Sequence, residues 1–141
     1  MPGHTDFQRL ALFLARRTGD ADYAQVLAKD TFRWALSQPQ DIPFGTLLAA
    51  SARPAAAAIR ERDREVARQR SMAGIIAALH PMEREVLRLV YWDKLSMGEL
   101  ADFLGCSMAR AGALLDKAYG HAERRATRLG FVVADSSDET A

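Results

Sequence analysis

The sequence is poor in cysteine and lacks long apolar runs, and each shortage excludes a class of protein. Its 141 residues include one cysteine, Cys106, so no internal disulfide can form. Arginine or aspartate interrupts every apolar stretch well short of the roughly 20 apolar residues that a membrane-spanning helix requires. Residues 1–19 also lack the apolar core of a secretory signal. We therefore expect a cytoplasmic protein with no membrane partner.

A strong charge of one sign is missing too. The chain has 19 Lys and Arg residues against 18 Asp and Glu residues, which gives a formal net charge of +1. Affinity for nucleic acid that comes from charge alone grows with the number of cations presented to the phosphates. DNA binding would therefore require the fold to gather its basic residues on one face.

The motifs on which enzymes depend are also absent. We find no Gly-x-Ser-x-Gly, no phosphate-binding glycine loop and no pair of carboxylates with a histidine. The three histidines are far apart, and Cys106 has no partner at zinc-ligand spacing. We predict no enzymatic activity, no cofactor and no metal site.

What the sequence does contain is helical patterning from end to end. Alanine, leucine, arginine and glutamate dominate, and no Asn-Gly or Asp-Gly turn joins alternating segments, so we predict an all-α protein. Apolar residues at three- and four-residue spacing indicate a helix that stops at Gly19, and a second helix that ends before Pro39 and Pro43. On the second helix Trp34 fits the apolar stripe, which favours a core position over an exposed base-stacking one. Pro54 predicts a kink or a fresh start in a third helix.

The charge pattern divides the chain into two small helical domains. Residues 60–65 alternate in sign and are almost without apolar content, so we predict a charged linker over 60–72 or a solvated helix there. The first domain then covers 1–59 and the second covers 73–130. Residues 131–141 end in an acidic segment with no apolar face, which predicts a disordered tail.

The second domain carries the spacing of a helix-turn-helix. Ser96 and Glu99 form a capping box at the start of a short helix, and Gly105 supplies the turn after it. Ala101 is small enough for a steep helix crossing, and Cys106 follows the glycine as an apolar anchor. An ordinary corner between two helices of a bundle is the alternative interpretation of the same spacing.

Three stretches of this domain also carry a family resemblance. They are Leu79-His80-Pro81-Met82-Glu83-Arg84-Glu85-Val86-Leu87, Leu95-Ser96-Met97-Gly98-Glu99-Leu100-Ala101 and Leu104-Gly105-Cys106-Ser107. These stretches are similar to region four of bacterial sigma factors. The upstream part, with Thr18-Gly19-Asp20 and Lys29-Asp30-Thr31-Phe32, resembles region two, especially in the extracytoplasmic-function group. The order and lengths of the segments from about residue 5 to 128 agree with that arrangement.

The resemblance implies a transcription regulator that engages core RNA polymerase and promoter DNA. It places polymerase contacts on the second helix, and we expect Lys29 and Arg33 to make them. It places DNA contacts on the helix after Gly105. There we expect phosphate and groove contacts from five residues: Ser107, Arg110, Lys117, Arg124 and Arg125.

A second interpretation uses the same resemblance. The sigma-like domains of alphaproteobacterial general stress response regulators keep the two-domain architecture, do not read promoters, and bind an anti-sigma factor. Gly112 and Leu114 stand where the sigma family commonly has lysine and arginine, and 113–118 is similar to the blunted final helix of those domains. The alternative is therefore a sigma mimic or adaptor that binds an anti-sigma factor or another protein regulator without reading DNA.

Overall fold

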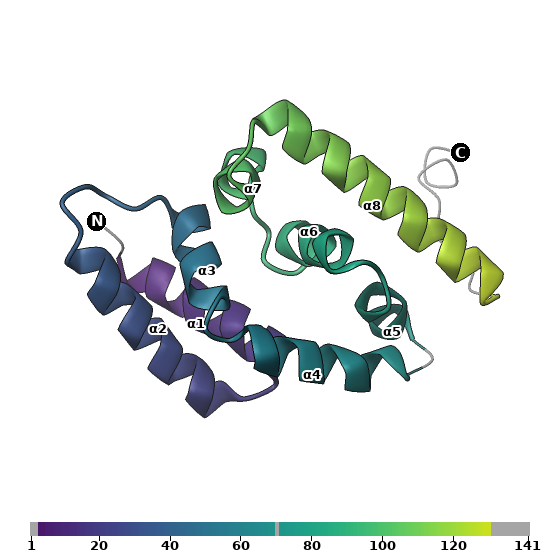
Figure 1. Cartoon of the computed structure of the whole chain (residues 1–141), viewed down its shortest axis with the longest axis horizontal. Coiled ribbons are helices and arrows are strands. Elements are labelled where there is room, and N and C mark those ends of the chain that lie inside the picture. The colour runs from purple at the N-terminus through teal and green to yellow at the C-terminus, as the bar shows by residue number, and fades with distance from the viewer. Residues whose placement is uncertain (1–2, 70, 131–141) are drawn as a thin grey trace.

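The computed structural model describes residues 3–69 and 71–130, and this part of the chain is entirely helical (Figure 1). It contains no strand, which confirms the all-α prediction. The predicted disordered tail, 131–141, lies outside the described residues. The helices are α1 (His4–Thr18), α2 (Ala21–Leu36), α3 (Phe44–Ala52), α4 (Ala56–Ala67), α5 (Met72–Ala77), α6 (Pro81–Tyr91), α7 (Met97–Leu104) and α8 (Met108–Arg128).

Two groups of helices pack together, mainly where α3 lies against α7. Helices α1, α2 and α3 form one group, α5, α7 and α8 surround α6 on the other side, and α4 runs between the two groups (Figure 1). None of the helices in the described ranges is both long and apolar enough to cross a membrane.

Glycine and proline set the helix ends where the sequence predicts them. Gly19 ends α1 in the left-handed conformation, with φ of 69°, and its N–H donates to the carbonyl of Ala15. Asp20 then caps α2, because its carboxylate accepts the N–H of Tyr23 at 3.0 Å. The fresh start expected near Pro54 is confirmed, since α3 ends at Ala52 and α4 begins at Ala56.

The charged segment differs from the predicted linker. Its residues up to 67 belong to α4, and Asp63 is only 3% exposed. Asp63 and Val66 lie three residues apart and share the buried side of that helix. One residue of the alternating-charge segment, Asp63, therefore faces inward. The segment is therefore not fully solvated. The division into two domains stays a prediction.

One apolar core runs through both groups of helices. Leu10, Phe13 and Leu14 of α1 belong to the same cluster as Leu100 of α7 and Ala111 of α8. A smaller cluster lies between α5, α6 and α8. The helix-turn-helix therefore shares its core with the N-terminal helices. Other buried members of the main cluster are Ala11, Ala24, Leu27, Ala28, Ala35, Leu47, Leu48, Ala55, Val86, Leu89, Leu95 and Ala101.

The two groups approach each other closely at Gly45, at the start of α3. A Cβ atom added there would lie 2.2 Å from the carbonyl oxygen of Glu99 and 2.8 Å from the backbone nitrogen of Phe103, both on α7. Only glycine lets the two backbones come this close. Nearby, the ring of Phe13 meets that of Phe103 edge-on at 6.2 Å, and Arg9 forms a salt bridge with Glu99 at 3.2 Å.

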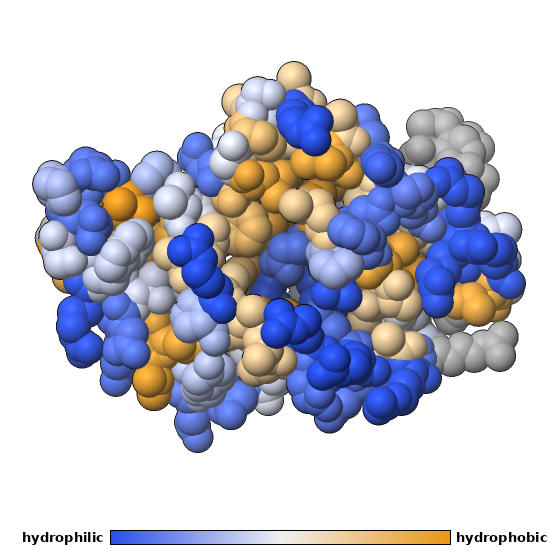
Figure 2. Space-filling view, viewed as in Figure 1, coloured by the Kyte–Doolittle hydropathy of each residue, from blue (hydrophilic) through white to orange (hydrophobic). Residues whose placement is uncertain are grey.

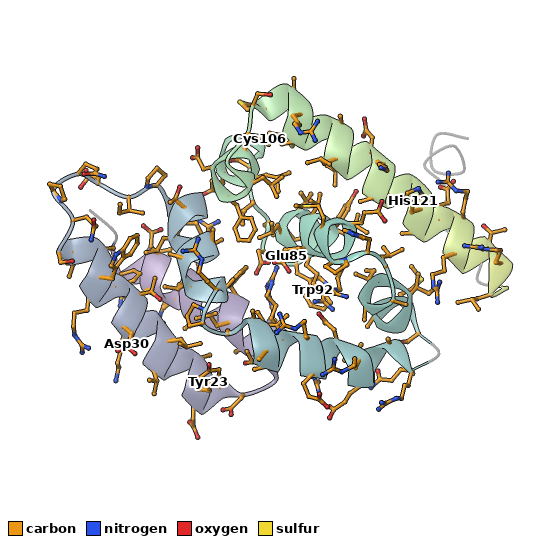
Figure 3. The ribbon with its side chains drawn as sticks, in the orientation of Figure 1. Tyr23, Asp30, Glu85, Trp92, Cys106 and His121 are labelled. Atoms are coloured by element: carbon orange, nitrogen blue, oxygen red, sulfur yellow. The ribbon has the colours of Figure 1, made fainter. Side chains whose placement is uncertain are left out.

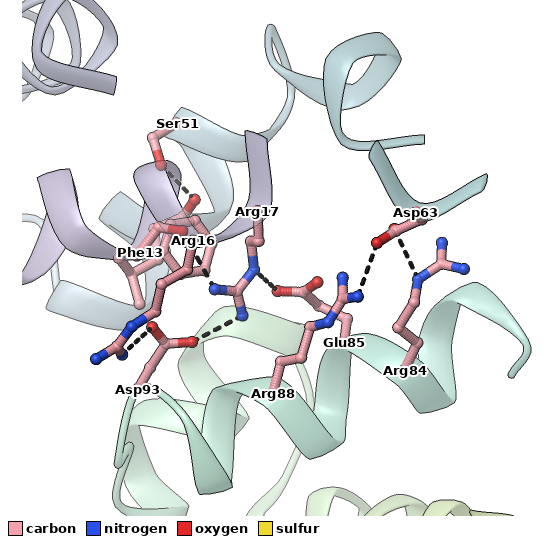
Figure 4. Close-up of polar contacts among 10 residues, drawn as sticks. Phe13, Arg16, Arg17, Ser51, Asp63, Arg84, Glu85, Arg88 and Asp93 are labelled. Atoms are coloured by element: carbon pink, nitrogen blue, oxygen red, sulfur yellow. Dashed lines mark hydrogen bonds and ion pairs between the residues drawn. The ribbon is translucent and has the colours of Figure 1, made fainter. Parts of the chain in front are cut away.

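Buried ion pairs join α6 to the N-terminal helices (Figure 4). The Arg17 side chain is fully buried, and its guanidinium lies 2.6 Å from Glu85 and 2.7 Å from Asp93. It also stacks on the ring of Phe13, with its central carbon 3.8 Å from the ring centroid. Further along α6, Arg84 and Arg88 both form ion pairs with buried Asp63 of α4. Because each of these buried charges has its partner on the other group of helices, the ion pairs fix how the two groups are placed relative to each other.

The two-group packing can be tested at Gly45. We expect Gly45→Ala to lower the free energy of unfolding by about 2 kcal/mol or more, because its methyl group would meet the backbone of α7. Gly112→Ala is the matched control. Its methyl group would meet nothing nearer than 3.8 Å, so it should stabilise α8 by roughly 0.5–1 kcal/mol. Urea unfolding followed by circular dichroism measures both. If Gly45→Ala left the free energy of unfolding unchanged, α3 and α7 would not pack this way in solution.

The ion pairs of Arg17 make a second test. Arg17→Gln leaves Glu85 and Asp93 without their shared cation in a buried place, and we expect a loss of about 3–5 kcal/mol in the free energy of unfolding. Arg33→Gln removes an exposed pair with Asp30 and should cost at most about 1 kcal/mol. Equal effects of the two substitutions in the same unfolding assay would contradict a buried role for Arg17.

Candidate nucleic-acid interface

The turn between α7 and α8 has the geometry that its sequence predicts. The hydroxyl of Ser96 accepts the N–H of Glu99 at 3.1 Å, and the Glu99 carboxylate accepts the N–H of Ser96 at 3.0 Å, which closes the capping box. Gly105 adopts the left-handed conformation, with φ of 67°. Ala101 is buried at the helix crossing and Cys106 is half-buried. The helix-turn-helix is therefore confirmed.

Charge at Glu99 links this turn to the N-terminal helices. Burial raises the pKa of its carboxyl group, while hydrogen bonds from Arg9 and from Ser96 lower it by more, so that the pKa lies below its ordinary value. The carboxylate therefore stays charged around neutral pH, and it serves both the cap of α7 and the salt bridge to α1.

Helix α8 begins at an exposed end. The hydroxyl of Ser107 caps it by accepting the N–H of Arg110 at 3.2 Å, and Met108 is more than half exposed. Unpaired N–H groups and the positive end of the helix dipole favour an approaching phosphate at such an end. Apolar side chains gather over this turn in the space-filling view (Figure 2), so any phosphate contact there depends on Arg110.

Four cations share one exposed edge of α8. Arg110, Lys117 and Arg124 follow one another at seven-residue spacing, which returns to nearly the same side of a helix after two turns and about 10.5 Å. Arg128 lies one turn further on. All four residues are exposed, and none forms an ion pair with any residue that the structure describes. We call these four residues the basic edge.

Three neighbouring residues limit the basic edge. Arg125, which the sequence groups with Arg124, is half-buried, and its Nε lies out of solvent without a partner among the described residues. It therefore points to the inner side of α8, toward the buried side that carries Ala118. Asp116 and Glu123 are exposed on the side about 100° from the basic edge, where they would repel phosphates. A duplex could thus approach α8 favourably from one side only.

The two residues expected to bind polymerase lie elsewhere. Lys29 and Arg33 are exposed on α2, and Arg33 donates to Asp30 at 3.2 Å. Figure 3 labels Asp30 on α2 and His121 on α8, at opposite sides of the molecule. The structure therefore brings Ser107, Arg110, Lys117 and Arg124 to one helix, but it does not bring Lys29 and Arg33 to them.

Between α6 and α8 the surface is hollowed beside the basic edge. The hollow has a volume of about 360 Å³. His121 contacts Glu83 across it, and Lys117 stands at its rim. Leu114 is half-buried and lines the hollow together with Val86 of α6.

The sequence reasoning missed one exposed aromatic residue. Trp34 is 40% exposed and lines a hollow of about 360 Å³ between α2 and α3, together with Asp30 and Arg53, so the prediction that it belongs to the core is wrong. The buried stripe of α2 instead runs through Ala24, Leu27, Ala28, Thr31 and Ala35. Small residues carry that stripe, which is why the larger Trp34 gave the stronger but misleading signal.

Comparison with known families gives one match. Residues 75–119 match the family model described as Sigma-70, region 4, and they span the second half of α5, all of α6 and α7 and the first part of α8. The resemblance of this part to region four is therefore confirmed. No curated protein and no solved structure matches the chain. The resemblance of the upstream helices to region two, and of the whole to the extracytoplasmic-function group or to the stress-response regulators, stays a prediction.

Proposed function

We propose that this protein is a sigma-factor-like transcription regulator of the cytoplasm that binds promoter DNA through α8. The observation that carries the proposal is the basic edge, which lies exposed on the second helix of the helix-turn-helix and of which Arg110 and Lys117 fall within the region-four match. A helix of this kind enters the major groove with its first residues against the bases, while cations further along contact phosphates.

The residues divide by the contact they can make. Arg110, in the first turn, carries a guanidinium that can bond two acceptors of a guanine at once, and Ser107 lies beside it. Lys117, Arg124 and Arg128 lie further along the edge and suit phosphates. Ala109 and Ala113 offer no hydrogen bonds, so base reading would depend mainly on one arginine.

Engagement of core RNA polymerase is the second part of the proposal. Lys29 and Arg33 lie on the exposed side of α2, which neither α1 nor α3 covers. Lys29 forms no ion pair with any described residue, so its charge is free to meet an acidic surface. The distance of α2 from the basic edge would let one molecule touch polymerase and DNA on different faces.

A specific observation favours a second function, that of a sigma mimic or adaptor. The shared core and the close contact at Gly45 hold the N-terminal helices against the helix-turn-helix. A protein whose two parts are fixed together presents one compact surface and cannot reach two separated DNA elements. Such a protein would instead bind an anti-sigma factor or another protein regulator as a single body.

Salt dependence tests the DNA contact. Neutralising two phosphate contacts with Lys117→Ala and Arg124→Ala together should reduce the slope of log affinity against log salt by about 1.8, since each contact contributes about 0.9. Lys29→Ala, an exposed cation on α2, should leave the slope unchanged. Fluorescence anisotropy on a duplex over a series of NaCl concentrations measures all three proteins. A slope that the double substitution does not alter would remove α8 from the DNA interface.

Partner capture separates the two functions. If the protein is sigma-factor-like, a tagged chain should retain purified core polymerase. Lys29→Glu with Arg33→Glu should abolish this retention, because the two substitutions reverse the charge on the exposed side of α2. Gln25→Glu, on the same helix, is the control. If core polymerase is not retained by the unmodified chain while a small regulator is, the adaptor function replaces the first proposal.

A further inference from the structure

A hollow beside the end of α6 is lined by aromatic and basic residues. It has a volume of about 410 Å³, which lies within the roughly 300–1,000 Å³ usual for ligand pockets. Its lining consists of Arg16 of α1 and of Tyr91, Trp92 and Lys94 at the end of α6. None of these four residues is acidic. We call this feature the aromatic hollow.

Two aromatic rings belong to the aromatic hollow. Tyr91 is 50% exposed in the last turn of α6, and Trp92 follows it as a half-buried residue (Figure 3). The guanidinium of Arg88, whose side chain is 3% exposed, packs on the ring of Trp92 with its central carbon 5.0 Å from the ring centroid. This contact restrains the indole ring from the interior of the molecule. Restrained or exposed rings of this kind offer a flat surface on which another planar group can stack.

The exposed charge at the aromatic hollow is positive. Arg16 donates to the carbonyl oxygen of Trp92 at 2.7 Å, which fixes its guanidinium at the edge of the hollow. Arg16 also approaches Asp93 at 3.7 Å, but that carboxylate is 6% exposed and pairs more closely with buried Arg17, at 2.7 Å (Figure 4). Lys94 is exposed and forms no ion pair with any residue that the structure describes. The hollow therefore presents cations to solvent and no acid.

Lys94 has a backbone conformation that is unfavourable for a lysine. It follows α6 in the left-handed region, with φ of 58°, and across it the N–H of Leu95 donates to the carbonyl of Leu89 at 3.0 Å. Glycine takes the same left-handed position at the ends of α1 and α7. A lysine there costs conformational free energy that a glycine would not. Strained residues are concentrated at binding sites, and this one carries an ammonium group at the edge of the hollow.

We propose that the aromatic hollow binds an unpaired nucleotide of single-stranded DNA. The base would stack on the exposed ring of Tyr91 with Trp92 beside it, and the adjoining phosphates would meet Arg16 and Lys94. Proteins bind single strands by combining aromatic surfaces with cations, because every base has a flat face and every phosphate a charge. An acidic peptide would match the cations but not the rings, and a duplex keeps its bases stacked inside. An unpaired strand matches both.

The site is separate from the basic edge and does not depend on the function proposed above. Its residues belong to α1 and to the end of α6, whereas the basic edge lies on α8. Arg16 comes from one group of helices and Tyr91 from the other, so the aromatic hollow is complete only while the two groups are packed together. Single-strand binding would therefore also report on that packing.

Tryptophan fluorescence of the full chain tests the site. The chain has two tryptophans, so Trp34→Phe leaves Trp92 as the one reporter. A single-stranded oligothymidylate should quench its fluorescence, because a base would lie beside the indole ring, and a duplex of the same length should not. In this background Tyr91→Ala should weaken the affinity for the oligothymidylate by about 5- to 150-fold, the range found when one stacking aromatic is removed.

Lys94→Gly separates binding from stability. Glycine relieves the left-handed strain, so Tm should rise. The lost phosphate contact should lower the slope of log affinity against log salt by about 0.7 for a single strand. Lys29→Gln, which removes an exposed cation of α2, is the matched control and should leave the slope unchanged. A variant that is more stable and yet binds the oligothymidylate less tightly has not lost binding through misfolding.

Three results would overturn the proposal. They are an absence of Trp92 quenching by the oligothymidylate, equal quenching by the duplex or by an oligoglutamate peptide, and an affinity that neither Tyr91→Ala nor Lys94→Gly alters. The salt dependence of duplex binding at α8 is a separate measurement, so failure of this site and failure of the proposed function are distinguishable.

Discussion

The charges on the inner side of α6 set how the two groups of helices are placed relative to each other, because each of these buried charges requires a partner. Glu85 meets Arg17 of α1, while Arg84 and Arg88 meet Asp63 of α4. Burying charges gains little stability over burying apolar groups, but a charge without its partner is costly in such a place. This contact therefore selects one arrangement of the two groups more than it strengthens their association.

The opposite side of α6 is apolar and packs against α8, so one helix joins two kinds of interface. Through it the position of the basic edge is coupled to that of the N-terminal helices. The contact of Gly45 with the backbone of α7 also fixes the position of the helix-turn-helix relative to the N-terminal helices. The outer side of α8 stays exposed in this arrangement, which is why DNA binding and a compact single-body partner role are both compatible with the fold.

Much of the helix-turn-helix could be predicted because its signals are local. A capping box, a left-handed glycine and a serine cap act within four residues, and Ser96, Gly105 and Ser107 perform these roles in the structure. Arg110 and Lys117, two of the residues expected to contact DNA, lie seven residues apart and therefore share one edge of α8. The interpretation failed where a position depends on distant parts of the chain: Trp34 lies outside the buried stripe of α2, and Asp63 is buried where two arginines of α6 pair with it.

The sequence by itself determined the helices, their ends and the region-four character of residues 75–119, since these follow from side chains within a turn or two of each other. Only the tertiary structure decided that the two groups share one core, that Arg125 turns inward while Arg124 does not, and that Arg16 of α1 shares a hollow with Tyr91 of α6. The physical reason is that the energy of a buried charge depends on partners that lie 20 to 80 residues away along the chain, such as Asp63 with Arg84 and Arg17 with Asp93, and no local pattern records them.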